Sequence, residues 1–179
     1  ITTTWRMCAS AAKQKGIWNA ILGISWFWTF GFAFLALFIP WSKNVLHADE
    51  HVVTFFLALF SIGVGAGSLL CERLSKGKLE LGLVPLGSIG MSLFAIDLAL
   101  ASGPAAAVAP TGQVLLTLSQ FLHLPTSWRI VADLTILSVF AGFFIVPLYT
   151  CMQTWSDPAE RSRVIAANNE PYLRSAVLY

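Results

Sequence analysis

Charged residues are scarce in this sequence. Asp, Glu, Lys and Arg make up 11% of its 179 residues, whereas apolar residues make up 56%. In soluble proteins roughly 25% of the residues are charged. So few charges do not cover the surface of a water-soluble globule of this length, and we therefore expect lipid to surround much of the chain.

Several other features are missing as well. The net charge is only +2 and the basic residues form no continuous patch, which argues against a nucleic-acid partner. The three cysteines have no second metal ligand at short spacing, so we expect no metal centre. No pattern predicts a catalytic residue or a cofactor, and we expect no enzymatic activity. The chain begins with Ile instead of Met, and we expect it to be a piece of a longer protein.

Four stretches are apolar over a length that crosses a bilayer, which takes about 20 residues. They are residues 17–39, 52–71, 81–101 and 130–152. Because backbone groups in lipid must bond to one another, we predict helices, the first of them ending at Pro40. The sequence therefore predicts an all-α polytopic membrane protein. Its four transmembrane helices occupy 17–152, with cytoplasmic segments at 1–16 and 153–179.

The placement of basic residues supports this count. Lys and Arg next to membrane spans accumulate on the cytoplasmic side. Alternate segments outside the predicted spans contain nine and two of them, which predicts that both ends of the chain are cytoplasmic. A fifth span would break the alternation, so we interpret residues 114–124 as a short helix lying in the membrane interface. The nine are Arg6, Lys13, Lys15, Arg73, Lys76, Lys78, Arg161, Arg163 and Arg174.

Two short motifs suggest chemistry and have simpler explanations. His47, Glu50 and His51 fit the H-x-x-E-H pattern of one class of zinc peptidase. They occupy a short loop without a third ligand, and we interpret its acidic residues as the N-terminus of the second helix. Gly63 and Gly67 belong to a glycine-rich run that suggests a phosphate loop, but the run is apolar. Their spacing of four residues instead predicts close packing against a neighbouring helix.

Three sets of polar residues are candidates for function. Asp97 lies inside a predicted span, so its carboxylate either faces a cavity or proton pathway or reaches water at the headgroups. Asn19 on the first helix either lines a cavity or, in the interpretation we favour, bonds to a neighbouring helix. Glu72 and Arg73 are adjacent at the end of the second helix, which favours a charged latch between neighbouring helices.

This last region resembles the loop signature of the major facilitator superfamily, G-x-x-x-D-R-x-G-R/K. The residues that carry it are Gly67, Glu72, Arg73, Gly77 and Lys78. Glu replaces Asp here, and both glycines are displaced relative to the pattern. Two longer stretches, residues 65–93 and 141–169, are similar to the bacterial lysophospholipid transporter branch of that superfamily. The resemblance extends from Trp5 to Asn169 and maps the four spans onto helices seven to ten, part of the C-terminal bundle.

The resemblance implies a function and several partners. It implies a transporter that flips lysophospholipids, chiefly lysophosphatidylethanolamine, across the bacterial inner membrane by alternating access. The signature residues would act as a conformational latch. The loop before the eleventh helix would contain Arg161, Arg163, Asn168 and Asn169. The implied partners are membrane lipids, the lysophospholipid and the remaining transporter helices.

Two alternatives remain open at this point. In some bacteria the transporter is fused to an acyltransferase and an acyl carrier protein synthetase, so the four helices alternatively anchor such an enzyme. A facilitator for a different substrate also fits the superfamily signature. After Asn169 the sequence departs from the family, because residues 170–179 are few and include a proline where an apolar helix is expected.

Overall fold

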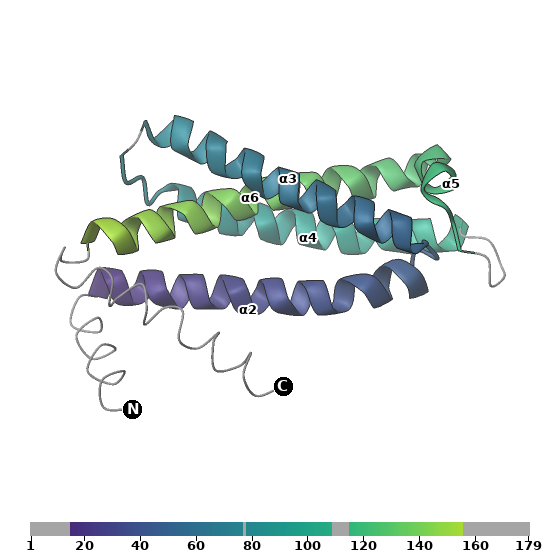
Figure 1. Cartoon of the computed structure of the whole chain (residues 1–179), viewed down its shortest axis with the longest axis horizontal. Helices are drawn as coiled ribbons and strands as arrows, with labels where there is room; N and C mark the ends of the chain where they lie inside the picture. The colour runs from purple at the N-terminus through teal and green to yellow at the C-terminus, as the bar shows by residue number, and fades with distance from the viewer. Residues whose placement is uncertain (1–14, 77, 109–114, 156–179) are drawn as a thin grey trace, which may run out of the picture.

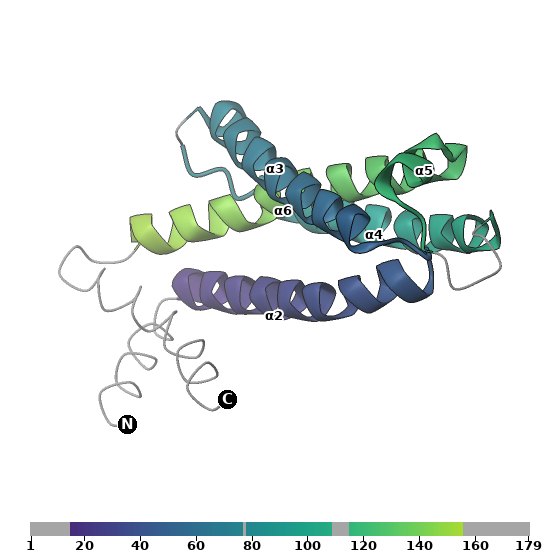
Figure 2. The same cartoon turned by 45° about the vertical axis from the view of Figure 1, so that its right-hand side comes forward.

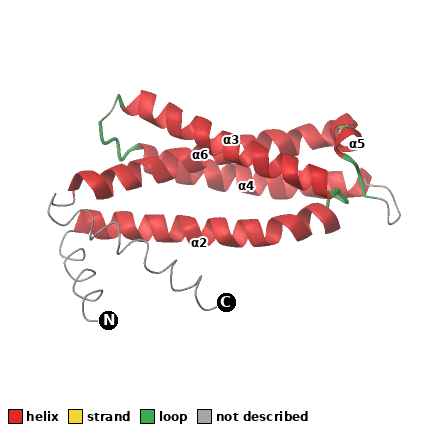
Figure 3. Ribbon diagram, viewed as in Figure 1, coloured by secondary structure: helices red, strands yellow, loops and turns green. Residues whose placement is uncertain are grey.

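The computed structural model describes residues 15–76, 78–108 and 115–155, and these residues are almost entirely helical (Figures 1 and 3). Their one β-type pairing is an isolated bridge between Ala48 and Leu116. Four helices are long and apolar enough to cross a membrane, which confirms the predicted all-α polytopic fold. The helices are α2 (Lys15–Asn44), α3 (Glu50–Ser75), α4 (Leu83–Val108), α5 (Leu118–His123) and α6 (Pro125–Trp155).

The four long helices lie side by side and alternate in direction along the chain (Figures 1 and 2). Helix α6 is the central one, because α2, α3 and α4 all pack against it. In its most apolar stretch 67% of the residues are buried inside the protein, against 11–28% in the other three helices. The outer helices therefore present most of their apolar side chains outward, as helices in lipid do.

The alternation places the basic side chains that the structure describes near the two ends of the bundle. One end has Arg73 and Lys76 at the end of α3 and Lys78 just after it. We call this the basic end. The other end has Lys43 near the end of α2 and Arg129 in the second turn of α6. The distribution agrees with the pattern on which the predicted orientation rests.

Glycines bring α3 and α6 into backbone contact, as their spacing predicts. A Cβ at Gly63 would overlap the side chain of Ser138, and one at Gly67 would overlap the backbone of Val139. From the other helix, a Cβ at Gly142 would come within 2.7 Å of the Gly67 carbonyl carbon. In lipid, where burial of apolar surface gives no gain, such close van der Waals packing is what holds helices together.

Glycines also allow α4 to pack closely against α6. A Cβ at Gly87 would lie 2.6 Å from the backbone nitrogen of Phe144. A Cβ at Gly90 would overlap the ring of Phe140. Both glycines belong to the first half of α4, near the basic end. The backbones of α4 and α6 therefore approach closely at that end.

Three predicted helix boundaries differ from the structure by five residues or more, and each difference involves proline. Helix α4 does not end at residue 101 but continues past Pro104 to Val108. Helix α2 does not end at Pro40 but continues to Asn44. The turn beyond the proline is held by packing, since Ser42 is fully buried and the Trp41 ring contacts the rings of Phe38 and Phe56. Helix α6 begins at Pro125 instead of residue 130, because proline at the first helical position loses no intrahelical hydrogen bond. Arg129 is consequently a helical residue.

The predicted short helix exists as α5 and does not form a fifth span. Thr117 caps it, accepting a hydrogen bond from the backbone of Gln120, whose side chain bonds back to Thr117. We expected its apolar face to lie against the membrane. Instead Phe121 is buried within the protein, with its ring 5.4 Å from that of Phe56. Helix α5 therefore covers the end of the bundle between α3 and α6.

Candidate functional site

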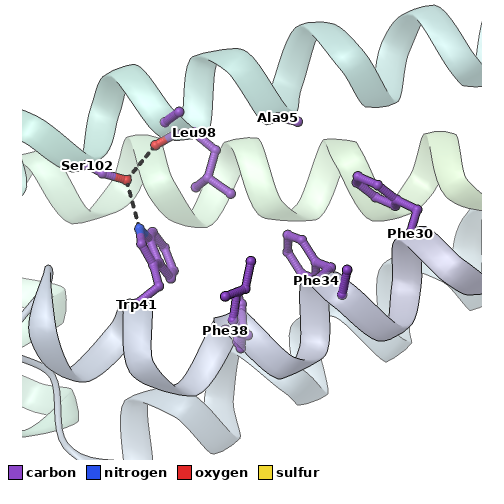
Figure 4. A pocket seen from close by; sticks show the side chains of 10 residues that line it. Phe30, Phe34, Phe38, Trp41, Ala95, Leu98 and Ser102 are labelled. Atoms are coloured by element: carbon purple, nitrogen blue, oxygen red, sulfur yellow. Dashed lines mark hydrogen bonds between the residues drawn. The ribbon is translucent and has the colours of Figure 1, made fainter.

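An apolar groove lies between α2 and α4 (Figure 4). It has a volume of about 300 Å³ and opens to the outside of the bundle. On α2, aromatic side chains spaced by four residues form its wall, with ring centroids 6.2 Å apart for Phe30 and Phe34 and 5.3 Å for Phe34 and Phe38. The α4 wall consists of Ala95, Leu98, Ala99 and Ser102.

The groove has a polar end. The indole Nε1 of Trp41 donates a hydrogen bond to the Ser102 hydroxyl across a distance of 3.2 Å. The Ser102 hydroxyl in turn donates to the backbone carbonyl of Leu98 at 2.7 Å. Figure 4 shows these two bonds at one side of the aromatic row. The groove thus combines a long apolar wall with one bonded polar pair near the end of α2.

A second cavity lies between α2 and α6 toward the basic end, beside the start of α4. Its volume is about 480 Å³, and Asn19 is the polar side chain among the residues that line it. Asn19 is exposed and makes no hydrogen bond to any residue that the structure describes. The structure thus places Asn19 at a cavity, and both interpretations of its role stay predictions.

A charged cluster joins α4 to α6 at the end opposite the basic end. Arg129 donates two hydrogen bonds to the carboxylate of Asp97, one from Nε to Oδ2 at 3.1 Å and one from Nη2 to Oδ1. Both side chains are partly exposed, at 53% for Arg129 and 38% for Asp97. Such paired bonds between a guanidinium and a carboxylate fix the relative orientation of the two groups.

Asp133 is the second carboxyl group of this cluster and differs from Asp97. It lies one turn beyond Arg129 on α6 and is only 3% exposed. Its Oδ2 atom has no hydrogen-bond partner. Its ionisable neighbours are Asp97 and Arg129. The cluster therefore contains one guanidinium and two carboxyl groups; the guanidinium bonds to Asp97, and one oxygen of the buried Asp133 has no hydrogen-bond partner.

The predicted latch residues are separated by the structure. Gly67 lies in the contact with α6, whereas Glu72 and Arg73 are exposed in the last turns of α3. Within the described residues neither of these two makes an ion pair. Lys78 is exposed just after the helix. Gly77 and the group Arg161, Arg163, Asn168 and Asn169 lie outside the described residues.

The H-x-x-E-H motif serves to begin a helix. The carboxylate of Asp49 accepts hydrogen bonds from the backbone nitrogens of His51 and Val52, both at 3.0 Å, and caps the N-terminus of α3. Glu50 lies in the first turn, where an acidic side chain favours the positive end of the helix dipole. Among the described residues no group of three His, Cys, Asp or Glu side chains has the arrangement of a metal site.

The sequence analysis missed the pairings that define both sites. It assigned no role to Asp133, although the four-residue spacing from Arg129 places the two on one helix face. It also missed the bond between Trp41 and Ser102, which joins residues 61 positions apart. The first could have been found by extending the fourth helix to Pro125. The second had no local signal, because only the packing of α2 beside α4 brings the two side chains together.

Comparison of the chain with protein-family models, with curated proteins and with solved structures gave no match. What is established is the fold: an all-α protein with four helices able to span a membrane. The groove and the charged cluster are the two features of its described residues that a functional proposal must explain.

Proposed function

We propose that this chain is part of a transporter that moves lysophospholipids across the bacterial inner membrane by alternating access. The observation that carries the proposal is the groove between α2 and α4. It is apolar over most of its length, polar at one end and open at the side. A lipid with one acyl chain and a polar headgroup has the same distribution of properties. The resemblance of residues 65–93 and 141–169 to the lysophospholipid transporters supports the same substrate.

The dimensions of the groove fit a single acyl chain. Phe30 and Trp41 are eleven residues apart on α2, which corresponds to about 16 Å at 1.5 Å per residue. A volume of about 300 Å³ over this length makes the groove narrow. We expect a narrow groove to hold one acyl chain more readily than two, which favours a lysophospholipid over a diacyl phospholipid.

The polar end of the groove suits the headgroup region. Trp side chains are enriched where a membrane meets water, because the ring is apolar and its N–H bonds to polar groups. Trp41 lies three residues before the end of α2, and Ser102 lies near the end of the α4 span. In the proposed complex the headgroup lies beside this pair, and the acyl chain extends along the Phe38, Phe34 and Phe30 side chains.

The proposed orientation follows from the basic residues. The basic end of the bundle faces the cytoplasm, where Lys and Arg flanking spans accumulate, and so do both ends of the chain. The groove then has its polar pair on the outer side, where lysophospholipid would enter. On the cytoplasmic side, Glu72 and Arg73 are exposed and available to helices of the longer protein. We assign the latch to a contact with those helices.

The experiment is photolabelling of the chain in lipid vesicles. The probe is lysophosphatidylethanolamine with a photoreactive diazirine near the end of its acyl chain. We expect crosslinks in α2 near Phe30, reduced by excess unlabelled lysophosphatidylethanolamine but not by the diacyl lipid. Ala99→Trp fills the groove and should lower labelling at least about tenfold, equivalent to about 1.4 kcal/mol of binding free energy.

The matched control is Leu100→Trp, at the neighbouring position. Leu100 is 64% exposed and does not line the groove, so this variant should label like the unmodified chain. Equal labelling of the two tryptophan variants, or equal competition by diacyl lipid, would contradict the proposal. Transport itself is tested by uptake of labelled lysophosphatidylethanolamine into spheroplasts with and without the gene that encodes this chain. Loss of uptake in its absence is the expected result.

A further inference from the structure

We propose that Asp133 is a proton-binding site, and that Asp97 and Asp133 exchange a single guanidinium, that of Arg129, as the proton binds and leaves. The proposal rests on the geometry of these three side chains and is independent of the substrate. It differs from the sequence-based expectation, which placed a possible proton pathway at Asp97.

Asp97 is poorly suited to binding a proton in this arrangement. Both of its carboxylate oxygens accept hydrogen bonds from Arg129, which favours the ionised form. Its side chain is also 38% exposed, so the protein encloses it less than it encloses Asp133. Asp97, the carboxyl group that the sequence indicated as functional, is thus already neutralised by the positive charge of Arg129.

Asp133 has the opposite surroundings. It is 3% exposed, with the fully buried Ile130 and Leu134 beside it on α6. A buried carboxylate without compensating donors is costly, and Oδ2 of Asp133 has none. A second negative charge next to Asp97 adds repulsion. Neutral Asp133, by contrast, has an O–H group that is able to donate a hydrogen bond, whereas two carboxylates are acceptors only.

The other elements at this end bring no further charge to Asp133. Helix α3 brings Val53 and Phe56 to the apolar cluster around Ile130 and Leu134. The charged side chains of α2 and α3 at this end are exposed, as at Lys43 and Glu50, or cap a helix, as at Asp49. His123 of α5 bonds to the backbone of Ser119. A proton fits this place better than a metal ion, since no three-residue metal group exists in the described chain.

We therefore propose two arrangements of the cluster, which differ in the carboxylate that Arg129 bonds to and in the protonation of Asp133. In the first, Arg129 bonds to Asp97 across α4 and α6, as it does in the structure, and the proposed proton is on Asp133. In the second, Arg129 turns to Asp133, four residues away on its own helix, and the O–H bond of Asp133 breaks. The proton leaves to water by way of the exposed Asp97 carboxylate. The net charge of the cluster changes from zero to −1, and the ion pair between α4 and α6 is lost.

The test is the protonation state of the aspartates in the full chain in lipid vesicles. The chain has four, at positions 49, 97, 133 and 157, and aspartate labelled with ¹³C at the carboxyl carbon makes each visible by solid-state NMR and infrared spectroscopy. We expect one neutral carboxyl signal at about pH 5, where exposed aspartates are ionised. Asp133→Asn should remove it. Asp49→Asn, which keeps the helix cap, should leave it unchanged.

Asp97→Asn tests the exchange of Arg129. With no carboxylate at position 97, the guanidinium is free for Asp133, so the neutral signal should disappear although Asp133 is present. Absence of a neutral aspartate in the unmodified chain, or its persistence in Asp133→Asn, would refute the proton site. Persistence in Asp97→Asn would refute the exchange. Because no substrate is added, neither result depends on whether the chain binds lysophospholipid.

Discussion

The backbone contact between α3 and α6 gives the sharpest test of the fold, because two neighbouring glycines differ in what surrounds them. Gly67 faces α6, and a Cβ there would lie 2.9 Å from the Cα of Val139 and closer still to its carbonyl group. Gly65, two residues earlier, has nothing within 4 Å of the corresponding position. Alanine at position 67 must therefore displace backbone, whereas alanine at position 65 occupies free space.

The pair of variants isolates the packing effect. Overfilling a packed contact costs about 1–3 kcal/mol. Replacing glycine by alanine within a helix stabilises it by about 0.5–1 kcal/mol, and this gain is common to both positions. We therefore expect Gly67→Ala to be less stable than Gly65→Ala by about 1–3 kcal/mol. Gly142→Ala should resemble Gly67→Ala, because its Cβ would meet the Gly67 backbone from the other helix.

The measurement is reversible unfolding in mixed micelles with an increasing fraction of denaturing detergent, followed by tryptophan fluorescence and circular dichroism. Gly67→Ala and Gly142→Ala affect one contact, so their effects should not add in the double variant. Equal stability of Gly65→Ala and Gly67→Ala within about 0.5 kcal/mol would show that α3 does not pack on α6 through this face.

Two further outcomes are expected. Phe121→Ala should cost about 3–5 kcal/mol in the same unfolding assay, because the ring is 1% exposed and packs against Phe56; a loss below about 1 kcal/mol would mean that α5 does not cover the bundle. For the proposed orientation, cysteine at Lys43 should react with a membrane-impermeant maleimide in intact cells, and cysteine at Lys76 only after permeabilisation. The reverse pattern would invert the topology.

The sequence predicts the number of spans well, because the free-energy cost of placing charged side chains and unbonded backbone groups in lipid depends on each segment's own residues. It predicts the ends of the helices less well. At Pro40 the local rule expects a helix to stop, but burial of Ser42 and the aromatic contacts of Trp41 hold one more turn. At Pro125 the same residue type begins a helix. Proline alone does not distinguish the two cases, because tertiary packing decides them.

The candidate sites show the same limit more strongly. Composition and depth in the span identify Asp97 as unusual, but its role depends on where Arg129 lies, 32 residues further along the chain. The groove likewise consists of side chains from two helices that are not adjacent in sequence. A single sequence does not show which distant side chains are in contact. It therefore identifies a carboxyl group within a span, but it does not show whether that group has an ion-pair partner.

Helix α4 connects the two sites. Its residues Leu98 and Ser102 form a wall of the groove, while Asp97 bonds to Arg129 on α6. Near the basic end the same helix is held on α6 by backbone contact at Gly87. If Arg129 turns from Asp97 to Asp133, the constraint on α4 is released only at the end where the groove has its polar pair. A pivot of α4 about the glycine contact would then move Ser102 away from Trp41 and widen the groove. In this proposal, release of the proton and widening of the groove are one movement.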